Sequence, residues 1–301
     1  MAKSFVSVVS LLAILVAQPA RAQIFESVGV RAQGMGGGFV ALADDATATW
    51  WNPAGLAAGA YFNLLVEYDR SRMPPETSVK GLAIGFPALG LSYYRLPINQ
   101  MRRAASTGTT DFDRQDQGVL GVYGLTAGES LGHHLVVAST LKLERSADTH
   151  GDLDMGAIAR FGVMRLGLTV KNLRKPTLAT DGGPLTLERQ ARAGVALVGH
   201  TTGLISDMAV ALDADLTATP TPVGDVRHVG GGFEVWTFGK RVGIRAGTSG
   251  NTVGERRPAA SGGVSVAVSM GGYLKTYVDG QVTGGSDESR RGWSVGVRAT
   301  F

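Results

Sequence analysis

Apolar and polar residues alternate along most of the chain with a period of two. In the last ten residues, GWSVGVRATF, one face carries Trp293, Val295, Val297, Ala299 and Phe301. The intervening positions are glycine, serine, arginine and threonine, and the same alternation recurs in GVSVAVSM, MRLGLTVKN and DLDMGAIARF. Because a period of two is typical of β-strands with one apolar face, the pattern predicts an all-β protein.

Fourteen runs of this kind follow residue 60. Each spans 8 to 13 residues, which brackets the roughly 9–11 residues that a tilted strand needs to cross a bilayer. The predicted strands are 61–69, 78–87, 89–96, 116–126, 135–145, 151–161, 164–173, 187–198, 204–216, 226–237, 241–248, 260–270, 272–282 and 291–301.

The connections between the runs alternate in length. Those after odd-numbered runs are mostly long and polar, such as PINQMRRAASTGTTDFDRQ, and those after even-numbered runs are mostly short, such as FGK. Long loops at one end and short turns at the other are typical of outer-membrane barrels. A soluble sandwich would carry many Lys, Glu and Thr residues on its polar face, whereas Gly, Ser and Ala predominate here. We therefore expect a transmembrane antiparallel β-barrel of about 14 strands over residues 61–301.

The first twenty-two residues predict export. Lys3 precedes the apolar run VSVVSLLAILV, which is too short to span a bilayer as a helix, and Ala20-x-Ala22 forms a small-residue cleavage site. We expect residues 1–22 to be a secretory signal peptide that is cleaved before Gln23. The chain has no cysteine, which excludes disulfides, thiolate metal sites and a lipoprotein anchor.

Charge adds little to this picture. Without Lys3 and Arg21 the chain keeps 27 basic residues against 25 acidic ones, from totals of 29 and 25. The basic residues are scattered singly and form no patch interleaved with aromatic residues, so we expect no nucleic-acid partner.

Residues 23–60 precede the predicted barrel and contain the glycine-rich stretch GMGGGFVALADDATATWWNPAGLA. A dinucleotide fingerprint would need glycine at position 39, where Phe39 stands, and no Gly-Lys-Ser/Thr follows. Asn52-Pro53 predicts a helix start, with asparagine as the cap and proline at the first position. We therefore expect this segment to form a compact hatch, or plug, in the barrel lumen.

The stretch RAQGMGGGFVALADDATATWWNPAGLA resembles the N-terminal signature of the FadL-like outer-membrane transport proteins. It is equally similar to the PorV/PorQ proteins of type IX secretion, which belong to the same superfamily. The resemblance covers about thirty residues. It implies a fourteen-stranded barrel in which hydrophobic substrates bind at the extracellular loops and pass a hatch that rearranges. On this resemblance the hatch and gating positions are Gly34, Met35, Gly36, Asp44, Asp45, Asn52 and Pro53.

The chain departs from the transporter pattern in length. It is shorter than typical FadL-like transporters, and its longest loop, 97–115, is mostly polar. The apolar groove that captures ligand in those proteins is therefore not evident here.

Inward-facing strand positions predict a lumen of mixed charge. Asp207, Asp213 and Asp215 are expected to face basic residues on other strands, either as an ion-pair lattice that braces the hatch or as a polar conduction path. The expected lumen residues are Arg165, Lys171, Arg192, Asp207, Asp213, Asp215, Arg241, Arg245, Tyr273, Lys275 and Tyr277.

An enzyme is not expected. All five histidines lie at predicted strand ends or turns, and no nucleophile, base and orienting group come together in the sequence. The acidic pairs Asp152-x-Asp154 and Asp213-x-Asp215 are expected to be polar lining rather than Ca²⁺ ligands. We expect no catalytic residue, no metal and no cofactor.

Two functions from different classes remain. The first is passive outer-membrane transport of small hydrophobic molecules, gated by the hatch. The second is a non-conducting barrel of the PorV/PorQ kind, which binds partner proteins in type IX secretion or cell-surface assembly. An apolar passage through the hatch would favour transport, and a lumen packed with ion pairs would favour the second. The other expected partners are outer-membrane lipid and the barrel assembly machinery, through the strand that ends at Phe301.

Overall fold

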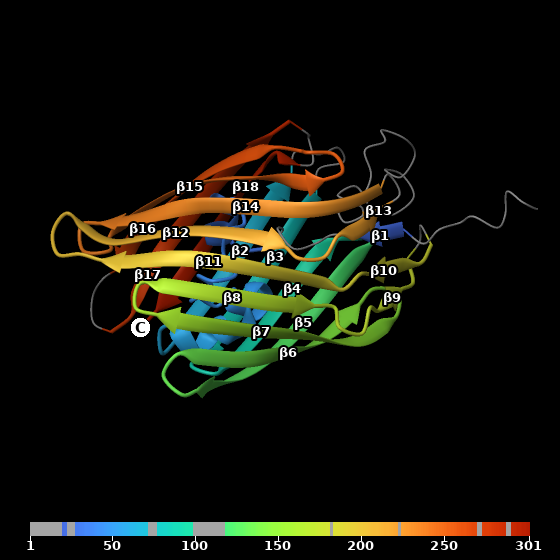
Figure 1. The fold of residues 1–301 in the computed structure, drawn as a ribbon, viewed down its shortest axis with the longest axis horizontal. Helices are drawn as coiled ribbons and strands as arrows, with labels where there is room; N and C mark the ends of the chain where they lie inside the picture. The colour runs from blue at the N-terminus through green and yellow to red at the C-terminus, as the bar shows by residue number, and fades with distance from the viewer. Residues whose placement is uncertain are drawn as a thin grey trace, which may run out of the picture.

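The computed structural model contains a barrel of fourteen antiparallel strands (Figure 1). It describes residues 20–22, 28–71, 77–98, 118–180, 183–221, 224–269, 273–286 and 290–301. The wall strands are β2 (Asn63–Ser71), β3 (Thr77–Phe86), β4 (Leu89–Pro97), β5 (Val119–Leu131), β6 (Leu135–Arg145), β7 (Thr149–Phe161), β8 (Met164–Lys171), β11 (Gln190–His200), β12 (Ile205–Asp215), β14 (Gly224–Thr237), β15 (Val242–Val253), β16 (Ala259–Ser269), β17 (Lys275–Gly285) and β18 (Gly292–Thr300). Each predicted strand is confirmed, with its ends shifted by a few residues.

The wall is closed by two pairings. The first wall strand, β2, pairs antiparallel with the last, β18, and β12 pairs with β14. Every wall strand therefore has a neighbour on both sides, which satisfies the backbone groups that lipid cannot.

The alternating pattern places apolar side chains on the outside. Val66, Leu82 and Leu141 are among many large apolar residues that are 43 to 55% exposed on the barrel surface. The intervening charged residues are buried inside, including Glu67, Lys142 and Glu234. This arrangement is that of a barrel with an apolar outer band and a polar interior.

The two ends of the barrel differ. The end that carries the C-terminus has short turns, such as 87–88 between β3 and β4 and 162–163 between β7 and β8. The opposite end carries the longer connections, with the short strands β9 (Thr177–Leu178), β10 (Leu185–Leu187) and β13 (Thr219–Thr221). The β9–β10 hairpin was not expected from the sequence, which predicts a loop there.

Residues 28–60, called here the luminal segment, lie inside the barrel. The segment contains the helices α2 (Val30–Gly34) and α3 (Ala48–Trp51) and the 3₁₀ helix η3 (Pro53–Ala58). Asn52 caps η3 by accepting a hydrogen bond from the Ala54 amide at 3.2 Å, as its sequence predicts. Most of the segment's apolar residues are buried, and Met35, Phe39 and Trp51 are completely so.

The expected signal peptide lies mostly outside the described residues, which begin at Ala20. Ala20–Ala22 form β1, which pairs in parallel with β10 at the long-loop end. In the described part of the chain, no helix has the length and apolar character needed to cross a membrane.

Candidate functional site

The luminal segment is seated on glycines of the barrel wall. At these inward-facing glycines a Cβ atom would come within 3.2 Å of an atom of the segment, in several cases a backbone atom, so the two pack more closely than side chains would allow. The group, called here the glycine seat, comprises Gly85, Gly90, Gly156, Gly167, Gly194, Gly230, Gly232, Gly247 and Gly296. Because the seat extends over strands all around the barrel, the segment crosses the whole lumen.

Two wall carboxylates bind backbone amides of the segment. Glu67 on β2 accepts hydrogen bonds from Gly29 at 3.0 Å and from Val30 at 3.1 Å, at the start of α2. Asp213 on β12 accepts from Phe39 and Val40, each at 2.7 Å. A carboxylate that accepts such amides satisfies donors that would otherwise be buried without partners.

Asn52 binds the segment to a third part of the wall, strand β7. Its side-chain nitrogen donates to the Val40 carbonyl at 2.9 Å within the segment and to the Ala157 carbonyl at 3.1 Å on β7. Pro53 packs beside it against Gly156 of the glycine seat. These contacts account for the Asn-Pro pair at this point of the sequence.

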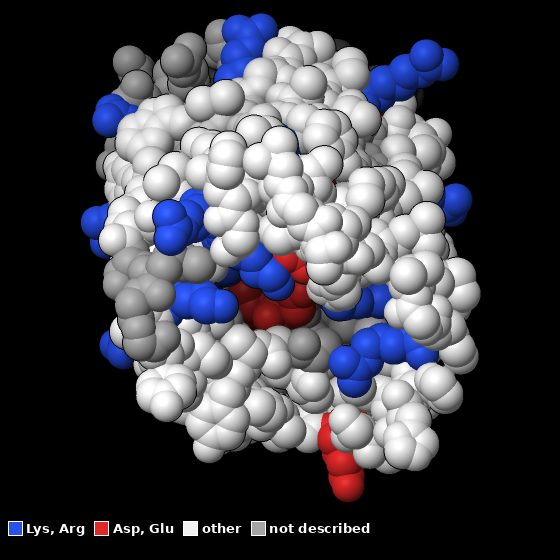
Figure 2. Space-filling view, turned by 90° about the vertical axis from the view of Figure 1, so that its left-hand side faces the viewer, with Lys and Arg blue, Asp and Glu red and all other residues white. Residues whose placement is uncertain are grey.

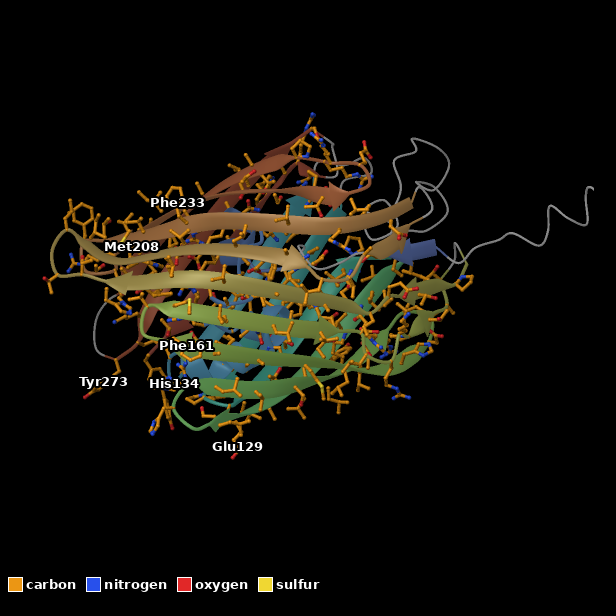
Figure 3. The ribbon with its side chains drawn as sticks, in the orientation of Figure 1. Glu129, His134, Phe161, Met208, Phe233 and Tyr273 are labelled. Carbon is orange, nitrogen blue, oxygen red and sulfur yellow. The ribbon has the colours of Figure 1, made fainter. Side chains whose placement is uncertain are left out.

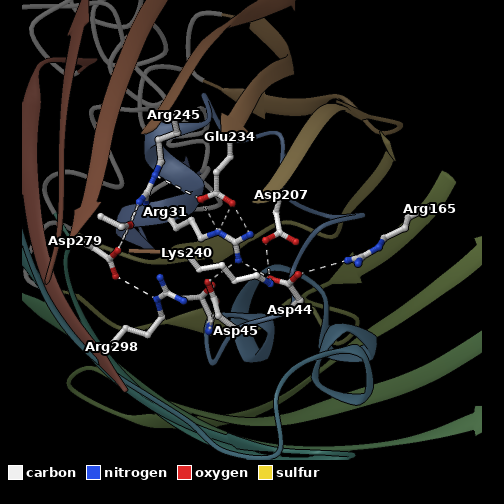
Figure 4. Close-up of polar contacts among 12 residues, drawn as sticks. Arg31, Asp44, Asp45, Arg165, Asp207, Glu234, Lys240, Arg245, Asp279 and Arg298 are labelled. Atoms are coloured by element: carbon white, nitrogen blue, oxygen red, sulfur yellow. Dashed lines mark hydrogen bonds and ion pairs between the residues drawn. The ribbon is translucent and has the colours of Figure 1, made fainter. Parts of the chain in front are cut away.

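Arg31 lies at the centre of an ion-pair network (Figure 4). Its guanidinium forms ion pairs with Glu234 of β14 at 2.7 Å, with Asp45 at 3.4 Å and with Asp44. Asp44 also lies 3.5 Å from Arg165 of β8. Burial lowers the pKa of Arg31, but the three carboxylates outweigh burial and raise it well above its ordinary value. The network therefore joins the segment to the wall through charges that stay ionised.

The network continues along β15, β17 and β18. Arg245 lies 3.6 Å from Glu234 and 3.5 Å from Asp279, and Arg298 lies 3.2 Å from Asp279. Arg298 also covers the ring of Tyr277 at 4.7 Å from its centroid. The carboxylates and guanidinium groups thus alternate, which reduces the cost of burying each charge.

A second polar cluster lies nearer the long-loop end. The Lys142 ammonium is 3.0 Å from Glu144, 2.9 Å from Asp152 and 2.9 Å from Asp154. It also donates to the side-chain oxygen of Asn172 at 2.7 Å. The acidic pair considered for Ca²⁺ therefore binds a lysine, and no group of His, Cys, Asp and Glu in the described ranges is arranged to hold a metal ion.

A cavity of about 300 Å³ lies beneath the luminal segment, at the short-turn end of the barrel. It opens to the surface, and Figure 2 shows it as a hollow with acidic residues at its floor and Lys and Arg residues around its rim. Its lining includes Asp44, Asp45 and Glu234 of the network, with Trp236 and Tyr277 from the wall. The network is therefore the boundary between this cavity and the rest of the lumen.

All the predicted hatch positions lie in the luminal segment. Met35 and Gly36 pack on β14 and β15, and Gly34 lies against the side chain of Arg245. Asp44 and Asp45 belong to the Arg31 network, whereas Asn52 and Pro53 belong to the contact with β7. The sequence signature thus supplies both the backbone contacts and the ion pairs of the segment.

Most of the predicted lumen residues point inward, but their partners differ from expectation. Asp215 pairs with one of the expected cations, Arg192, at 2.7 Å. Asp207 pairs instead with Lys240 at 3.0 Å, and Asp213 binds the backbone amides described above. Lys171 lies over the Trp50 ring at 3.5 Å from its centroid. The inward positions that line the cavity are Arg165, Asp207, Lys275 and Tyr277.

Two predicted lumen residues are corrected by the structure. Tyr273 is 93% exposed and points away from the barrel (Figure 3), because it lies before β17 begins at Lys275. Arg241 is exposed in the turn before β15, where no strand pairing directs it inward. In addition, His228 is buried on β14 and is not a solvated turn residue.

Sequence reasoning missed Arg31, Glu67 and Glu234. Glu234 and Glu67 occupy inward strand positions between outward apolar residues, so the period of two was sufficient to find them. Arg31 lies on a five-residue helix whose pattern carries no such signal.

No protein-family model and no curated protein matches the chain. Among solved structures, the CymD monoaromatic hydrocarbon channel matches with a TM-score of 0.65 and 13% identity, over 93% of this chain and 99% of that one. The P. putida toluene transporter TodX matches with a TM-score of 0.61 and 8% identity, over 92% of this chain and 99% of that one. A Pseudomonas aeruginosa FadL homologue matches with a TM-score of 0.57 and 11% identity, over 93% of this chain and 99% of that one. At these identities the likeness establishes the fold.

Proposed function

We propose that this chain, which has the fold of the FadL-like outer-membrane barrels, is a passive transporter of small hydrophobic molecules. The observation that carries the proposal is the structural match over nearly the whole chain to proteins described as a monoaromatic hydrocarbon channel and a toluene transporter. Passive movement follows the solute gradient, so the barrel needs no cofactor.

In this proposal residues 23–60, which include the luminal segment, form the hatch and act as the gate. The glycine seat and the amides bound by Glu67 and Asp213 hold most of it against the wall. The part that borders the cavity is held by side chains, through Arg31, Asp44 and Asp45. We infer that gating is a local movement of Asp44 and Asp45 rather than removal of the segment.

The chain is proposed to reach the outer membrane after cleavage of residues 1–22. The apolar outer surface would contact membrane lipid, and the last strand, β18, together with Phe301 after it, would engage the barrel assembly machinery. The short-turn end would then face the periplasm, as the loop lengths of outer-membrane barrels imply.

A second candidate is the PorV/PorQ type of barrel, which binds partner proteins and does not conduct. The observation that favours it is the ion-pair network across the lumen, formed by Arg31, Glu234, Arg245 and Asp279. Transport was expected to show an apolar passage through the hatch instead. A neutral hydrocarbon would have to pass groups whose charges are already satisfied by one another.

Mass spectrometry of the protein, extracted gently from its own outer membrane, tests the two candidates together. Transport predicts a recurrent bound lipid or aromatic compound that is lost when residues 34–57 are deleted. A stoichiometric protein partner without any small molecule would reject transport and support the second candidate. As the folding control, the deletion variant should migrate differently on a gel before and after heating, as folded outer-membrane barrels do.

A further inference from the structure

The cavity at the short-turn end has the size of a site for a single-ring compound. Its volume of about 300 Å³ lies at the lower end of small-molecule sites, and a cavity of about 150 Å³ is enough to hold benzene. A ring with one small polar substituent therefore fits with room for water, whereas a long acyl chain would extend beyond it.

One wall of the cavity is aromatic and fixed in place. Trp236 and Tyr277 pack edge to face, with centroids 5.4 Å apart and planes at 74°. Arg298 lies over both rings, at 5.7 Å and 4.7 Å from their centroids, and is itself held by Asp279. Both rings line the cavity through the small part of each that stays exposed, 9% of Trp236 and 3% of Tyr277. A ligand ring that contacts either of them gains a favourable aromatic pair, edge to face or offset-stacked.

Within the described ranges, most charges that line the cavity take part in ion pairs. Asp44 and Glu234 bind Arg31, and Asp207 binds Lys240. Lys275 also lines the cavity, from the start of β17, and makes no ion pair within the described ranges. Its ammonium is therefore the cation that is available to a ligand, beside the aromatic wall to which Tyr277 belongs, two residues along the same strand.

We propose that this cavity binds small aromatic carboxylates, with the ring on Trp236 and Tyr277 and the carboxylate on the Lys275 ammonium. Only the role of the site rests on the proposed function. In that role the cavity would be the last binding site that a solute occupies before its release at the short-turn end. It narrows the solute class from neutral hydrocarbons to compact aromatic acids. The binding itself is independent of whether the barrel conducts.

Benzoate and benzyl alcohol, which share the ring but differ in charge, test the proposal by calorimetric titration of the full chain in detergent. Benzoate is expected to bind roughly ten-fold more tightly, because a hydrogen bond to a charged group adds this much. Lys275→Met should remove that preference and leave benzyl alcohol unchanged, whereas Trp236→Leu should weaken both. Arg241→Met is the matched control, since this nearby cation is exposed outside the cavity, and it should keep the preference.

Three results would overturn the proposal: no benzoate binding, equal binding of the two compounds, or an undiminished preference in Lys275→Met. Cellular uptake of a monoaromatic compound, measured separately, tests the proposed function. Absent uptake with intact benzoate binding would reject transport and keep the site, whereas normal uptake without benzoate binding would reject the site alone.

Discussion

Gly167 on β8 lies directly against the carbonyl group of Val40 in the luminal segment. A Cβ atom at position 167 would be 2.6 Å from the Val40 oxygen and 2.8 Å from the Ala41 Cα. Val40 is fixed from two further sides, because its amide donates to Asp213 and its carbonyl accepts from Asn52. This contact is therefore between two backbones, and neither can retreat without breaking hydrogen bonds.

Replacing Gly167 by valine should destabilise the seated segment, although valine favours strands more than glycine does. Overpacking of a close contact costs about 1–3 kcal/mol, and we expect a loss of this size in the free energy of unfolding in detergent. The control is Gly280→Val, since a Cβ at Gly280 has no atom within 4 Å. Equal stability of the two variants would show that the wall does not hold the segment at this point.

Replacing Arg31 by methionine should leave Asp44, Asp45 and Glu234 near one another without their shared cation. Removing one partner of a buried ion pair costs about 3–5 kcal/mol, and urea unfolding should show a loss in this range. Because the charges then repel, ion conductance through the barrel in planar bilayers should rise. Arg241→Met, which changes an exposed turn residue, should alter neither quantity. An unchanged conductance in the Arg31 variant would contradict the gating role given to this network.

Replacing Lys142 by methionine should be similarly costly, because its ammonium is shared by Glu144, Asp152 and Asp154. We expect a loss of about 3–5 kcal/mol in unfolding free energy. Lys80→Met is the control, because Lys80 is exposed. If the Lys142 variant matched this control, water or ions would have to stabilise the three carboxylates in place of lysine.

Acid should loosen the part of the segment around Asp44. Burial raises the pKa of this carboxyl, but Arg31 and Arg165 outweigh burial and hold the pKa below its ordinary value of 3.8. Since the folded pKa is the lower one, the stabilisation is present above pH 3.8 and is lost as the pH falls through the folded value. The chain has no cysteine, so Ala46→Cys reports opening through its rate of maleimide labelling.

That labelling rate, divided by the rate for free cysteine at the same pH because the thiolate is the reacting form, should be low above pH 4 and should rise below 3.8. In an Asp44→Asn background it should already be fast at neutral pH, because the ion pair with Arg31 is absent. Slow labelling at neutral pH in that background would mean that Asp44 does not hold the segment closed.

The wall of the barrel was predictable because each strand carries its own signal. An apolar side chain at every second position is required wherever a strand contacts lipid, so the register of Val295 and Val297 can be read without knowing their neighbours. The β9–β10 hairpin was missed because its strands have two and three residues, too few to show a period.

The partners inside the lumen were less predictable than its lining. The inward position of Asp207 follows from the period of two, but its pairing with Lys240 depends on the turn between β14 and β15. Tyr273 was assigned inward from an early strand start, and the shift to Lys275 places it in a turn. Ion pairs that cross a lumen depend on how the strands close, which no local pattern encodes.

Initial uptake of a radiolabelled monoaromatic compound, by cells that carry the protein in their outer membrane, tests the central claim of hatch-gated transport most directly. The account predicts faster uptake than in cells without the protein, and a loss of discrimination against larger solutes in Arg31→Met. Uptake equal to that of cells without the protein, at normal surface levels of folded barrel, would contradict transport and leave the partner-binding barrel as the function.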